Sequence, residues 1–401
     1  MSDGILVLNA GSSSIKFSLY TLAAGSPRLS SKGQIEGIGV APHFVAKSPD
    51  GQLLEERRWG KEADFHTLLE TLLDWIEHHL GDAELRVIGH RVVHGGVRYR
   101  HPVLIDDAVR AELRHLIPLA PLHQPHNIEV IDTIAALEPD VPQVACFDTA
   151  FHRDNDPLAT LFALPRPLIE EGVRRYGFHG LSYEFISRRL RALAPAAAQG
   201  KVVVCHLGSG ASMCAIDDGR SVASTMGFTA LDGLPMGTRT GQLDCGVVLY
   251  LLQEKGMSAE QIEHLLYKES GLLGLSGISN DMRILTESDD PNAQEAVDYF
   301  IYRITRELGS LAAAMGGLDA VVFTAGIGEH SPKVRARVLR AAEWLGLAVD
   351  DEANSLVEEG CISPGGARCS AWVIPTDEEL MIALHTEGIL ASLRQKETVP
   401  G

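Results

Sequence analysis

The sequence predicts an α/β protein that is built from two domains. Short apolar, β-branched runs at residues 86–93 and 141–147 alternate with segments of helical periodicity at residues 65–80 and 295–315, which is the pattern of an α/β fold. The chain has 401 residues. That is long for one hydrophobic core, so we expect two domains of about 150 to 250 residues each.

An internal repetition is the third observation behind this prediction. Residues 5–20 (ILVLNAGSSSIKFSLY) and 202–216 (VVVCHLGSGASMCAI) each consist of an apolar run, a turn of small residues and a second apolar run. Turns of Gly and Ser bring backbone N–H groups close to a bound anion, so two such turns facing each other would form a phosphate clamp. Buried strands that end in ordinary turns are the alternative, and the repetition favours the clamp.

Other segments carry clear local signals. Residues 320–330 (AVVFTAGIGEH) run from an apolar strand into two glycines, and Ser331 and Pro332 would be the N-cap and the first residue of the following helix. Residues 118–127 contain three prolines and two histidines, which predicts an ordered loop rather than regular structure. A last helix is predicted over residues 378–393.

Charge and composition exclude some functions. The net charge is −18 and there is no long Lys/Arg run, which argues against nucleic acid as a partner. Apolar stretches are far shorter than the roughly 20 residues of a spanning helix, and no leader precedes the first strand, so we expect a cytoplasmic protein with no membrane partner. The six cysteines form no C-x-x-C pair and are interpreted as structural.

The first turn carries candidate ligands for phosphate or its metal. Asn9, Ser12, Ser14 and Lys16 combine small polar groups with one ammonium, and alternate residues of the outgoing strand share a face. The alternative for Lys16 is a solvated strand residue.

Two arginines lie in unusual surroundings. Arg91, with His94, lies in an apolar strand that ends in GHRVVHGG, and Arg239 lies in the loop GLPMGTRTGQLD. A guanidinium in an apolar strand is costly unless it is paired or binds an anion, so a buried salt bridge is the alternative. Two such groups among glycines predict a small carboxylate or a transferring phosphoryl group as ligand.

Acidic and imidazole groups complete the candidates. Asp148 follows an apolar strand, the usual place for a catalytic residue, and a helix N-cap is the alternative. His179 is either a donor to phosphate oxygens or a packed core histidine, and His123 and His206 are similar cases. The chain has no Walker A, H-E-x-x-H or G-x-S-x-G motif. Few carboxylates are candidates for Mg²⁺, which needs only one or two; they are Asp148, Asp281, Glu378 and Glu379.

Ten segments in order resemble motifs of the acetate kinase family, and the resemblance covers essentially the whole chain. They are NAGSSSIK, GHRVVHGG, APLHQP, FDTAFH, RRYGFHG, HLGSGAS, GLPMGTRTG, SGLLGLSGISNDMR, FTAGIGEH and PTDEELMIA. The resemblance implies a two-domain actin-like ATPase fold with duplicated ββαβα-type cores and an interdomain nucleotide cleft. It also implies reversible, Mg²⁺-dependent phosphoryl transfer between ATP and acetate, with Mn²⁺ as a substitute, and a homodimer.

The resemblance also implies roles for individual residues. Asn9 and Glu378 would lie on the metal side, Arg91 and Arg239 would flank the acyl carboxylate and the phosphoryl group, Asp148 would be the essential acid, and His179 would donate to the transferring group. The acyl group would meet Arg91, Val93, Leu122, His123 and Ala230, and Ser12 and Ser14 would form the phosphate turn. The nucleotide would meet Lys16, His206, Leu207, Gly208, Ser209, Gly210, Asp281, Met282, Arg283, Gly326, Ile327, Gly328, Glu329 and His330.

The expected domains are residues 1–148, with a helix at 380–396 that packs back on them, and residues 149–379, which bind the nucleotide. The chain departs from the family pattern at several positions: Ser209, His330 and Gln124 replace Asn, Tyr183 replaces His, and Ala230 replaces Pro. Ala230 would enlarge the acyl pocket by about one or two methylenes, worth only roughly 1–3 kcal/mol in discrimination. A propionate or butyrate kinase is therefore an alternative, and a nucleotide-binding sensor without phosphoryl transfer is another.

Overall fold

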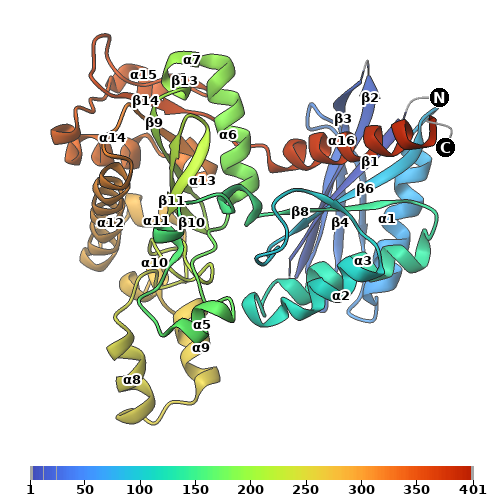
Figure 1. Ribbon diagram of the computed structural model, residues 1–401, viewed down its shortest axis with the longest axis horizontal. Helices are drawn as coiled ribbons and strands as arrows, with labels where there is room; N and C mark the ends of the chain where they lie inside the picture. The colour runs from blue at the N-terminus through green and yellow to red at the C-terminus, as the bar shows by residue number, and fades with distance from the viewer. Residues whose placement is uncertain (1–2, 12, 24, 399–401) are drawn as a thin grey trace. The chain divides into compact units, whose positions relative to one another are not determined.

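The computed structural model describes residues 3–11, 13–23 and 25–398 and divides into two compact units (Figure 1). The first unit comprises Met1–Ala150 and Asp377–Gly401, and the second comprises Phe151–Thr376. Sequence analysis placed the corresponding boundaries at residues 148 and 379. Among the described residues, no helix is both long and apolar enough to cross a membrane.

The first unit is built on an eight-stranded mixed sheet. Its strands are β1 (Asp3–Ala10), β2 (Ser14–Ala23), β3 (Ser26–Glu36), β4 (His43–Lys47), β5 (Leu53–Arg58), β6 (Glu84–Val92), β7 (Val103–Leu104) and β8 (Gln143–Phe147), in the order β5-β4-β3-β2-β1-β6-β8-β7. Strands β1, β6 and β8 are parallel, whereas β2 and β3 are antiparallel to their neighbours. The ends of β1, β6 and β8 therefore meet at one edge of the sheet.

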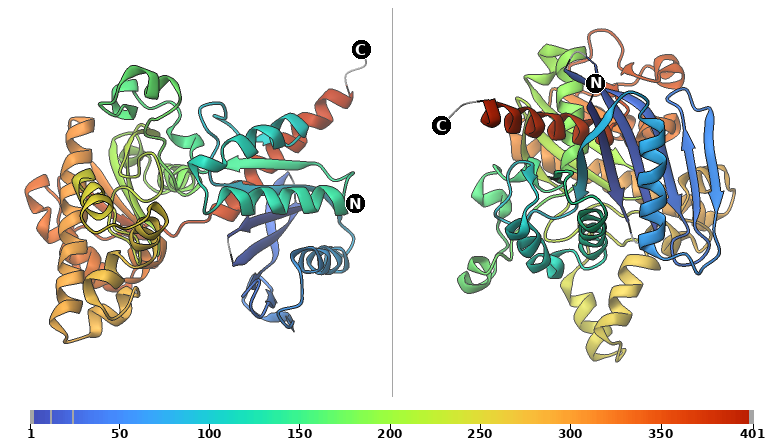
Figure 2. Two further views of the ribbon diagram at one scale, coloured as in Figure 1. Left: turned by 90° about the horizontal axis from the view of Figure 1, so that it is seen from below. Right: turned by 90° about the vertical axis from the view of Figure 1, so that its right-hand side faces the viewer.

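Helices cover both faces of this sheet. They include α1 (Phe65–His79), α2 (Asp107–His115), α3 (Gln124–Leu137) and α16 (Glu378–Thr398), with a short 3₁₀ turn η1 (Ile117–Leu119) (Figure 2). Leu6 and Leu8 pack in one cluster with apolar residues of α1 and α3, and α16 packs against β1 and β6. At Gly89 a Cβ atom would lie 2.3 Å from Thr386 Oγ1 of α16, so this glycine is required by close helix packing.

The second unit repeats the same strand arrangement. Its strands are β9 (Lys201–Leu207), β10 (Ala211–Asp217), β11 (Arg220–Ser224), β12 (Ala320–Thr324), β13 (Gly360–Cys361) and β14 (Ser370–Val373), in the order β11-β10-β9-β12-β14-β13. As in β3-β2-β1-β6-β8, two antiparallel strands are followed by three parallel ones. The predicted α/β fold with a duplicated core is therefore confirmed.

The second unit also holds many helices. They include η2 (Ala150–His152) at its start, α4 (Pro157–Thr160), α5 (Arg166–Glu170), α6 (Gly180–Leu193), α7 (Pro195–Ala198), α8 (Cys245–Gln253), α9 (Ala259–Lys268), α10 (Gly271–Ser276), α11 (Met282–Glu287), α12 (Pro291–Met315), α13 (Ala325–His330), α14 (Pro332–Ala341), η3 (Glu343–Leu345) and α15 (Asp351–Leu356). Helix α6 packs with residues of β9, β10 and β12 in one apolar cluster, and α12 packs against β9, β10 and β11.

Two local predictions have different outcomes. The predicted helix start is confirmed, because Ser331 caps α14 by accepting a hydrogen bond from the Val334 N–H. The prediction of a loop throughout residues 118–127 is wrong, because α3 begins at Gln124 with Pro125 in its first turn. A proline is tolerated there because the first N–H groups of a helix have no intrahelical partner.

Candidate active site

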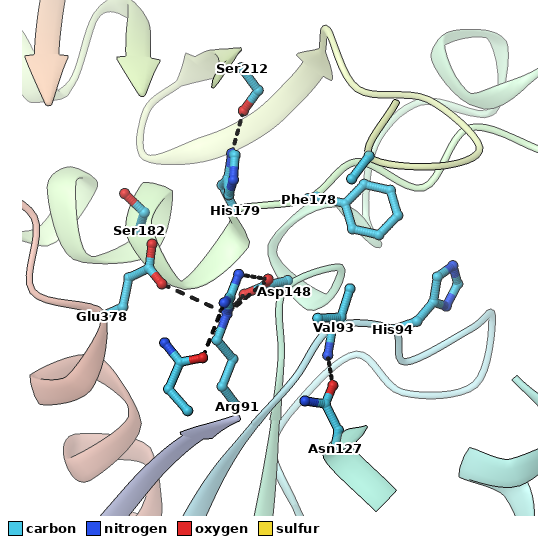
Figure 3. Close-up of polar contacts among 12 residues, drawn as sticks. Arg91, Val93, His94, Asn127, Asp148, Phe178, His179, Ser182, Ser212 and Glu378 are labelled. Atoms are coloured by element: carbon cyan, nitrogen blue, oxygen red, sulfur yellow. Dashed lines mark hydrogen bonds and ion pairs between the residues drawn. The ribbon is translucent and has the colours of Figure 1, made fainter. Parts of the chain in front are cut away.

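Four polar side chains gather at one edge of the first unit's sheet. Arg91 is the penultimate residue of β6, Asn9 is the penultimate residue of β1, Asp148 directly follows β8, and Glu378 begins α16. We call these four residues the Arg91 cluster, and Figure 3 labels Arg91, Asp148 and Glu378 among them. Because β1, β6 and β8 are parallel neighbours, the strand ends bring these residues together.

The Arg91 cluster is bonded around the guanidinium. Arg91 Nη2 donates to Asp148 Oδ2 at 2.6 Å, and its Nε contacts both carboxylate oxygens at 3.1 and 3.2 Å. Arg91 Nη1 donates to Asn9 Oδ1 at 3.2 Å, and Glu378 Oε2 lies 3.8 Å from Arg91 Nε. The Asp148 side chain is 2% exposed. The salt bridge considered as an alternative for Arg91 is therefore present.

The single positive charge of Arg91 does not balance the two carboxylates, Asp148 and Glu378, that face it in this cluster. Burial opposes the charge of Arg91, yet Asp148 and Glu378 raise its pKa. Burial raises the pKa of Glu378 to about 7, Asp148 and Glu379 add to this shift, and Arg91 and Lys16 oppose it. Two carboxylates thus share one guanidinium, which leaves the cluster short of positive charge.

The loop after β6 is held in place by α3. The Val93 N–H donates to Asn127 Oδ1 at 3.0 Å, and Asn127 Nδ2 donates to the Ala10 carbonyl at 2.9 Å. The His94 N–H donates to Gln124 Oε1 at 3.2 Å, and Gln124 Nε2 donates back to the His94 carbonyl at 3.1 Å. Asn127 was missed by sequence analysis. Gln124 was noted only as a departure from the family pattern, because neither its burial nor its partners show in the sequence.

Most of the predicted acyl-binding residues lie near this loop. Val93 is 6% exposed, and Leu122 and His123 immediately precede α3, whose first turn is bonded to the loop. Ala230 lies in the second unit, where its carbonyl accepts a hydrogen bond from Arg239 Nη1 at 3.1 Å. Lys16 is exposed on β2 of the first unit, paired with Asn9 in the β1–β2 register. Ser14 begins β2, and Ser12 lies outside the described residues.

A second group surrounds His179 in the second unit. His179 precedes α6 with a left-handed backbone (φ 58°), and its Nδ1 lies 2.8 Å from Ser212 Oγ (Figure 3). Its ring stacks on His206 with 4.1 Å between the ring centroids. His206 Nδ1 lies 2.8 Å from Ser182 Oγ. We call His179, Ser182, Tyr183, His206 and Ser212 the His179 cluster.

The turn between β9 and β10 lies beside this cluster. A Cβ atom at Gly210 would lie 3.5 Å from His179 Nε2 and 3.9 Å from Arg239 Nη1. Both groups lie on the side of Gly210 to which a Cβ atom would point, so an imidazole and a guanidinium approach the Gly/Ser turn from the same side. That arrangement suits an anion at the turn.

A cavity of ≈ 870 Å³ adjoins this turn. It is lined by Gly208, Ser209, Asn280, Asp281, Met282, Arg283, Thr286, Glu287, Gly326, Ile327, His330, Ser331, Pro332 and Lys333. Eight of the predicted nucleotide residues are in this lining: Gly208, Ser209, Asp281, Met282, Arg283, Gly326, Ile327 and His330. Sequence analysis missed six lining residues, Asn280, Thr286, Glu287, Ser331, Pro332 and Lys333. Of these, Asn280 and Ser331 directly adjoin predicted nucleotide segments, and Ser331 and Pro332 were predicted only as a helix start.

The remaining predicted nucleotide residues have other positions. His206 and Leu207 end β9 and are buried, and Gly328 is buried within α13. Glu329 Oε1 accepts hydrogen bonds from the Ala325 N–H at 2.7 Å and the Thr376 N–H at 3.1 Å. Glu329 therefore stabilises the start of α13 from within the helix.

Comparisons with known proteins agree with the resemblance seen in the sequence. The sequence profile of the Acetokinase family matches residues 4–384. An acetate kinase of Rhodopseudomonas palustris is 56% identical over 389 residues, which cover 96% of this chain and 98% of the relative. An acetate kinase of Nitrobacter hamburgensis is 53% identical, with 97% and 96% covered.

Solved structures give the same result for the fold. A propionate kinase of Francisella tularensis has a TM-score of 0.90 at 35% identity, with 96% of this chain and 99% of that chain covered. The acetate kinase of Porphyromonas gingivalis has a TM-score of 0.87 at 35% identity, with 97% and 100% covered. The chain therefore belongs to the acetokinase family.

Proposed function

We propose that this protein catalyses reversible phosphoryl transfer between ATP and acetate, giving acetyl phosphate and ADP. Membership of the acetokinase family carries this proposal. Two features of the structure support it: the Arg91 cluster with the adjoining Val93 loop, and the His179–Arg239 pair beside the ≈ 870 Å³ cavity. The first offers oxygen ligands for a divalent cation beside the mostly buried Val93, and the second suits a nucleotide with its phosphates.

The reaction we propose is a direct in-line transfer. A carboxylate oxygen of acetate attacks the γ-phosphorus, the bond from that phosphorus to the bridging oxygen of ADP breaks, and ADP leaves with the electron pair. Acetate is already ionised at neutral pH, so no general base is required. Catalysis then depends on positioning and on neutralising charge as it shifts between oxygens. Arg91 and Arg239 would bind the reacting groups, and His179 would donate to an oxygen of the phosphoryl group.

A divalent cation fits the donor set of the Arg91 cluster. Asn9, Asp148 and Glu378 offer the oxygen atoms that Mg²⁺ prefers. Burial, and after it the charges of Asp148 and Glu379, raise the pKa of Glu378, and a bound cation would favour its charged form. We propose that Asn9 and Glu378 hold Mg²⁺, for which Mn²⁺ can substitute. When bound, the ion supplies charge neutralisation on the phosphate oxygens. We further propose, on the resemblance alone, that two copies form a homodimer.

The identity of the acid is a separate part of the proposal. Propionate is the second candidate, because Ala230 replaces the family's usual Pro and a propionate kinase is among the similar structures. The acyl phosphate product, trapped as a hydroxamate, should be measured from ATP and Mg²⁺ with acetate, propionate and butyrate at several concentrations. The highest kcat/KM with acetate is the expected result. A preference for propionate would reassign the substrate, and no product from folded, ATP-binding protein would contradict the proposed function.

A further inference from the structure

The hydroxyl groups of Tyr183 and Ser212 form a hydrogen-bonded chain that ends at the imidazole of His179. Tyr183 Oη contacts Ser212 Oγ, which in turn lies 2.8 Å from His179 Nδ1. Tyr183 and Ser212 are both 0% exposed. Tyr183 lies one turn into α6, four residues after His179, and its N–H donates to the His179 carbonyl at 3.0 Å. The backbone therefore holds the two ends of the chain on one helix face.

The chemistry of the three groups gives the chain a direction. A phenol is a stronger donor than an alkyl hydroxyl, so Tyr183 donates to Ser212 Oγ. The Ser212 hydroxyl has one hydrogen, which it then donates to His179 Nδ1. A ring nitrogen that accepts a hydrogen bond carries no proton, so the proton of the neutral imidazole lies on Nε2.

Two further contacts agree with a neutral His179 of this tautomer. Its ring stacks on His206 at 4.1 Å, where two positively charged rings would repel each other. Its Nε2 faces Gly210, on the side from which Arg239 Nη1 also approaches. A proton on Nε2 is therefore directed toward the turn at which the proposed function places phosphate.

We propose that Ser212 and Tyr183 are positioning residues that hold His179 in its Nε2–H tautomer, so that it acts as a neutral hydrogen-bond donor. This inference rests on the proposed function for its catalytic consequence, but not for the tautomer itself. His179 loses no proton in this role. The two hydroxyls act through His179 and need not touch the substrate.

The tautomer can be measured directly in the intact protein. Histidine labelled with ¹⁵N distinguishes protonated from unprotonated ring nitrogens by NMR, and the His179 signals are assigned by their loss in His179→Gln. We expect an unprotonated Nδ1 and a protonated Nε2 in the wild-type protein. In Ser212→Ala, the ¹⁵N chemical shifts of both ring nitrogens should move toward the average of the protonated and unprotonated values, because the two tautomers would mix. Tyr183→Phe should move the His179 chemical shifts in the same direction, but by a smaller amount. Tyr183→His restores a hydrogen-bond donor at this position, so its His179 chemical shifts should be closer to the wild-type values than those of Tyr183→Phe.

Kinetics gives the second readout. Loss of a donor to a transition-state oxygen lowers kcat by about 10²–10³. Because the donating tautomer would remain partly populated in Ser212→Ala, we expect a smaller loss of about tenfold in kcat, with nearly unchanged KM values. Tyr176→Phe is the matched control. Tyr176 is also buried in the second unit, and its hydroxyl donates to the Gly172 carbonyl at 2.7 Å. Loss of this hydroxyl should change neither the His179 chemical shifts nor kcat.

Each outcome decides the inference. A wild-type proton on Nδ1, or unchanged His179 signals in both Ser212→Ala and Tyr183→Phe, would overturn it, even if kcat fell. If Ser212→Ala does not fold, the ¹⁵N spectra of the wild-type protein and of Tyr183→Phe still show which tautomer His179 adopts and whether Tyr183 holds it. A protein that makes no acyl phosphate yet shows the expected tautomer would contradict the proposed function and leave the hydroxyl chain standing.

Discussion

At the scale of single residues, the two arginines to which the proposed function gives a role differ in what surrounds them. Arg91 is bonded to a carboxylate that is 2% exposed, and removing one partner of such a pair costs about 3–5 kcal/mol in stability. An activity loss in Arg91→Ala would therefore combine folding and catalysis. Arg239 donates to the Ala230 carbonyl at 3.1 Å and lies beside Gly210, so it is the better position for a kinetic test.

Arg239→Ala should mainly lower kcat. The guanidinium would stabilise charge that develops on the transferring group, and the loss of one such donor costs about 10²–10³ in rate. Steady-state kinetics with varied ATP and acetate measures this. Arg340→Ala, which removes an exposed arginine that pairs with Asp351, is the control. An unchanged kcat in Arg239→Ala would exclude the proposed role.

Val93→Ala should mainly raise the KM for the acid. The side chain is 6% exposed, and the substitution keeps the backbone bond to Asn127 that holds the loop. Loss of apolar contact worth about 1–2 kcal/mol predicts a roughly tenfold higher KM for acetate. The KM for ATP should stay the same, and an equal rise in both constants would indicate a displaced loop rather than a lost contact with the acyl group.

At the scale of elements, helix α13 is stabilised at both ends by charged side chains. Glu329 Oε1 accepts from the Ala325 N–H at its start. At its end, Arg335 Nη1 donates to the carbonyls of Gly328 and Glu329 at 2.9 and 2.6 Å. Arg335 also donates to Asn354 from Nε and Nη2. Burial lowers the pKa of Arg335 to about 10, so the group stays charged at neutral pH.

Arg335→Met should displace α13 and weaken nucleotide binding. Met retains much of the buried volume but leaves the Gly328 and Glu329 carbonyls without this donor, which costs about 1–3 kcal/mol for each buried group. We expect lower stability and a KM for ATP raised by about tenfold, with the KM for acetate unchanged. Urea unfolding and steady-state kinetics measure the two effects. Arg340→Met, at an exposed position of α14, the helix that also carries Arg335, should show neither.

At the scale of the whole molecule, each unit contains a buried histidine that is held neutral. His90 Nε2 lies 2.7 Å from Gln143 Oε1 in the first unit, and burial lowers the pKa of His90 to about 4. His152 contacts Ser221 Oγ and the Phe178 carbonyl in the second unit, and burial lowers its pKa to about 4 as well. The unfolded chain has an ordinary histidine pKa near 6.5, so it binds more protons than the folded protein between pH 4 and 6.5.

Acid should therefore destabilise both units. The stabilisation is complete above pH 6.5 and is lost as the pH falls toward 4; by pH 5 each histidine accounts for about 2 kcal/mol. His152→Asn should be less stable than the wild-type protein at pH 7, yet should lose about 2 kcal/mol less between pH 7 and pH 5. Urea unfolding at both values measures this. His264→Asn, at an exposed position, is the control, and equal losses in all three proteins would contradict the assignment.

Much of the fold could be predicted because its signals are local. Alternating burial and turns of small residues act within a few positions, so the strands around both Gly/Ser turns and the helix start at Ser331 were found correctly. The loop predicted for residues 118–127 failed because the effect of a proline depends on its place in a helix. Pro125 falls in the first turn, where it disrupts nothing.

The sequence by itself determined the duplicated sheet, the glycine turns and the charged groups, because a guanidinium such as Arg91 in an apolar strand requires a partner. Only the tertiary structure decided which groups meet. Asn127 bonds to a carbonyl 117 positions away, and Ser212 reaches His179 over 33 positions. Such residues look ordinary in the sequence, because no local propensity records a contact that forms only when strand ends and helix starts come together.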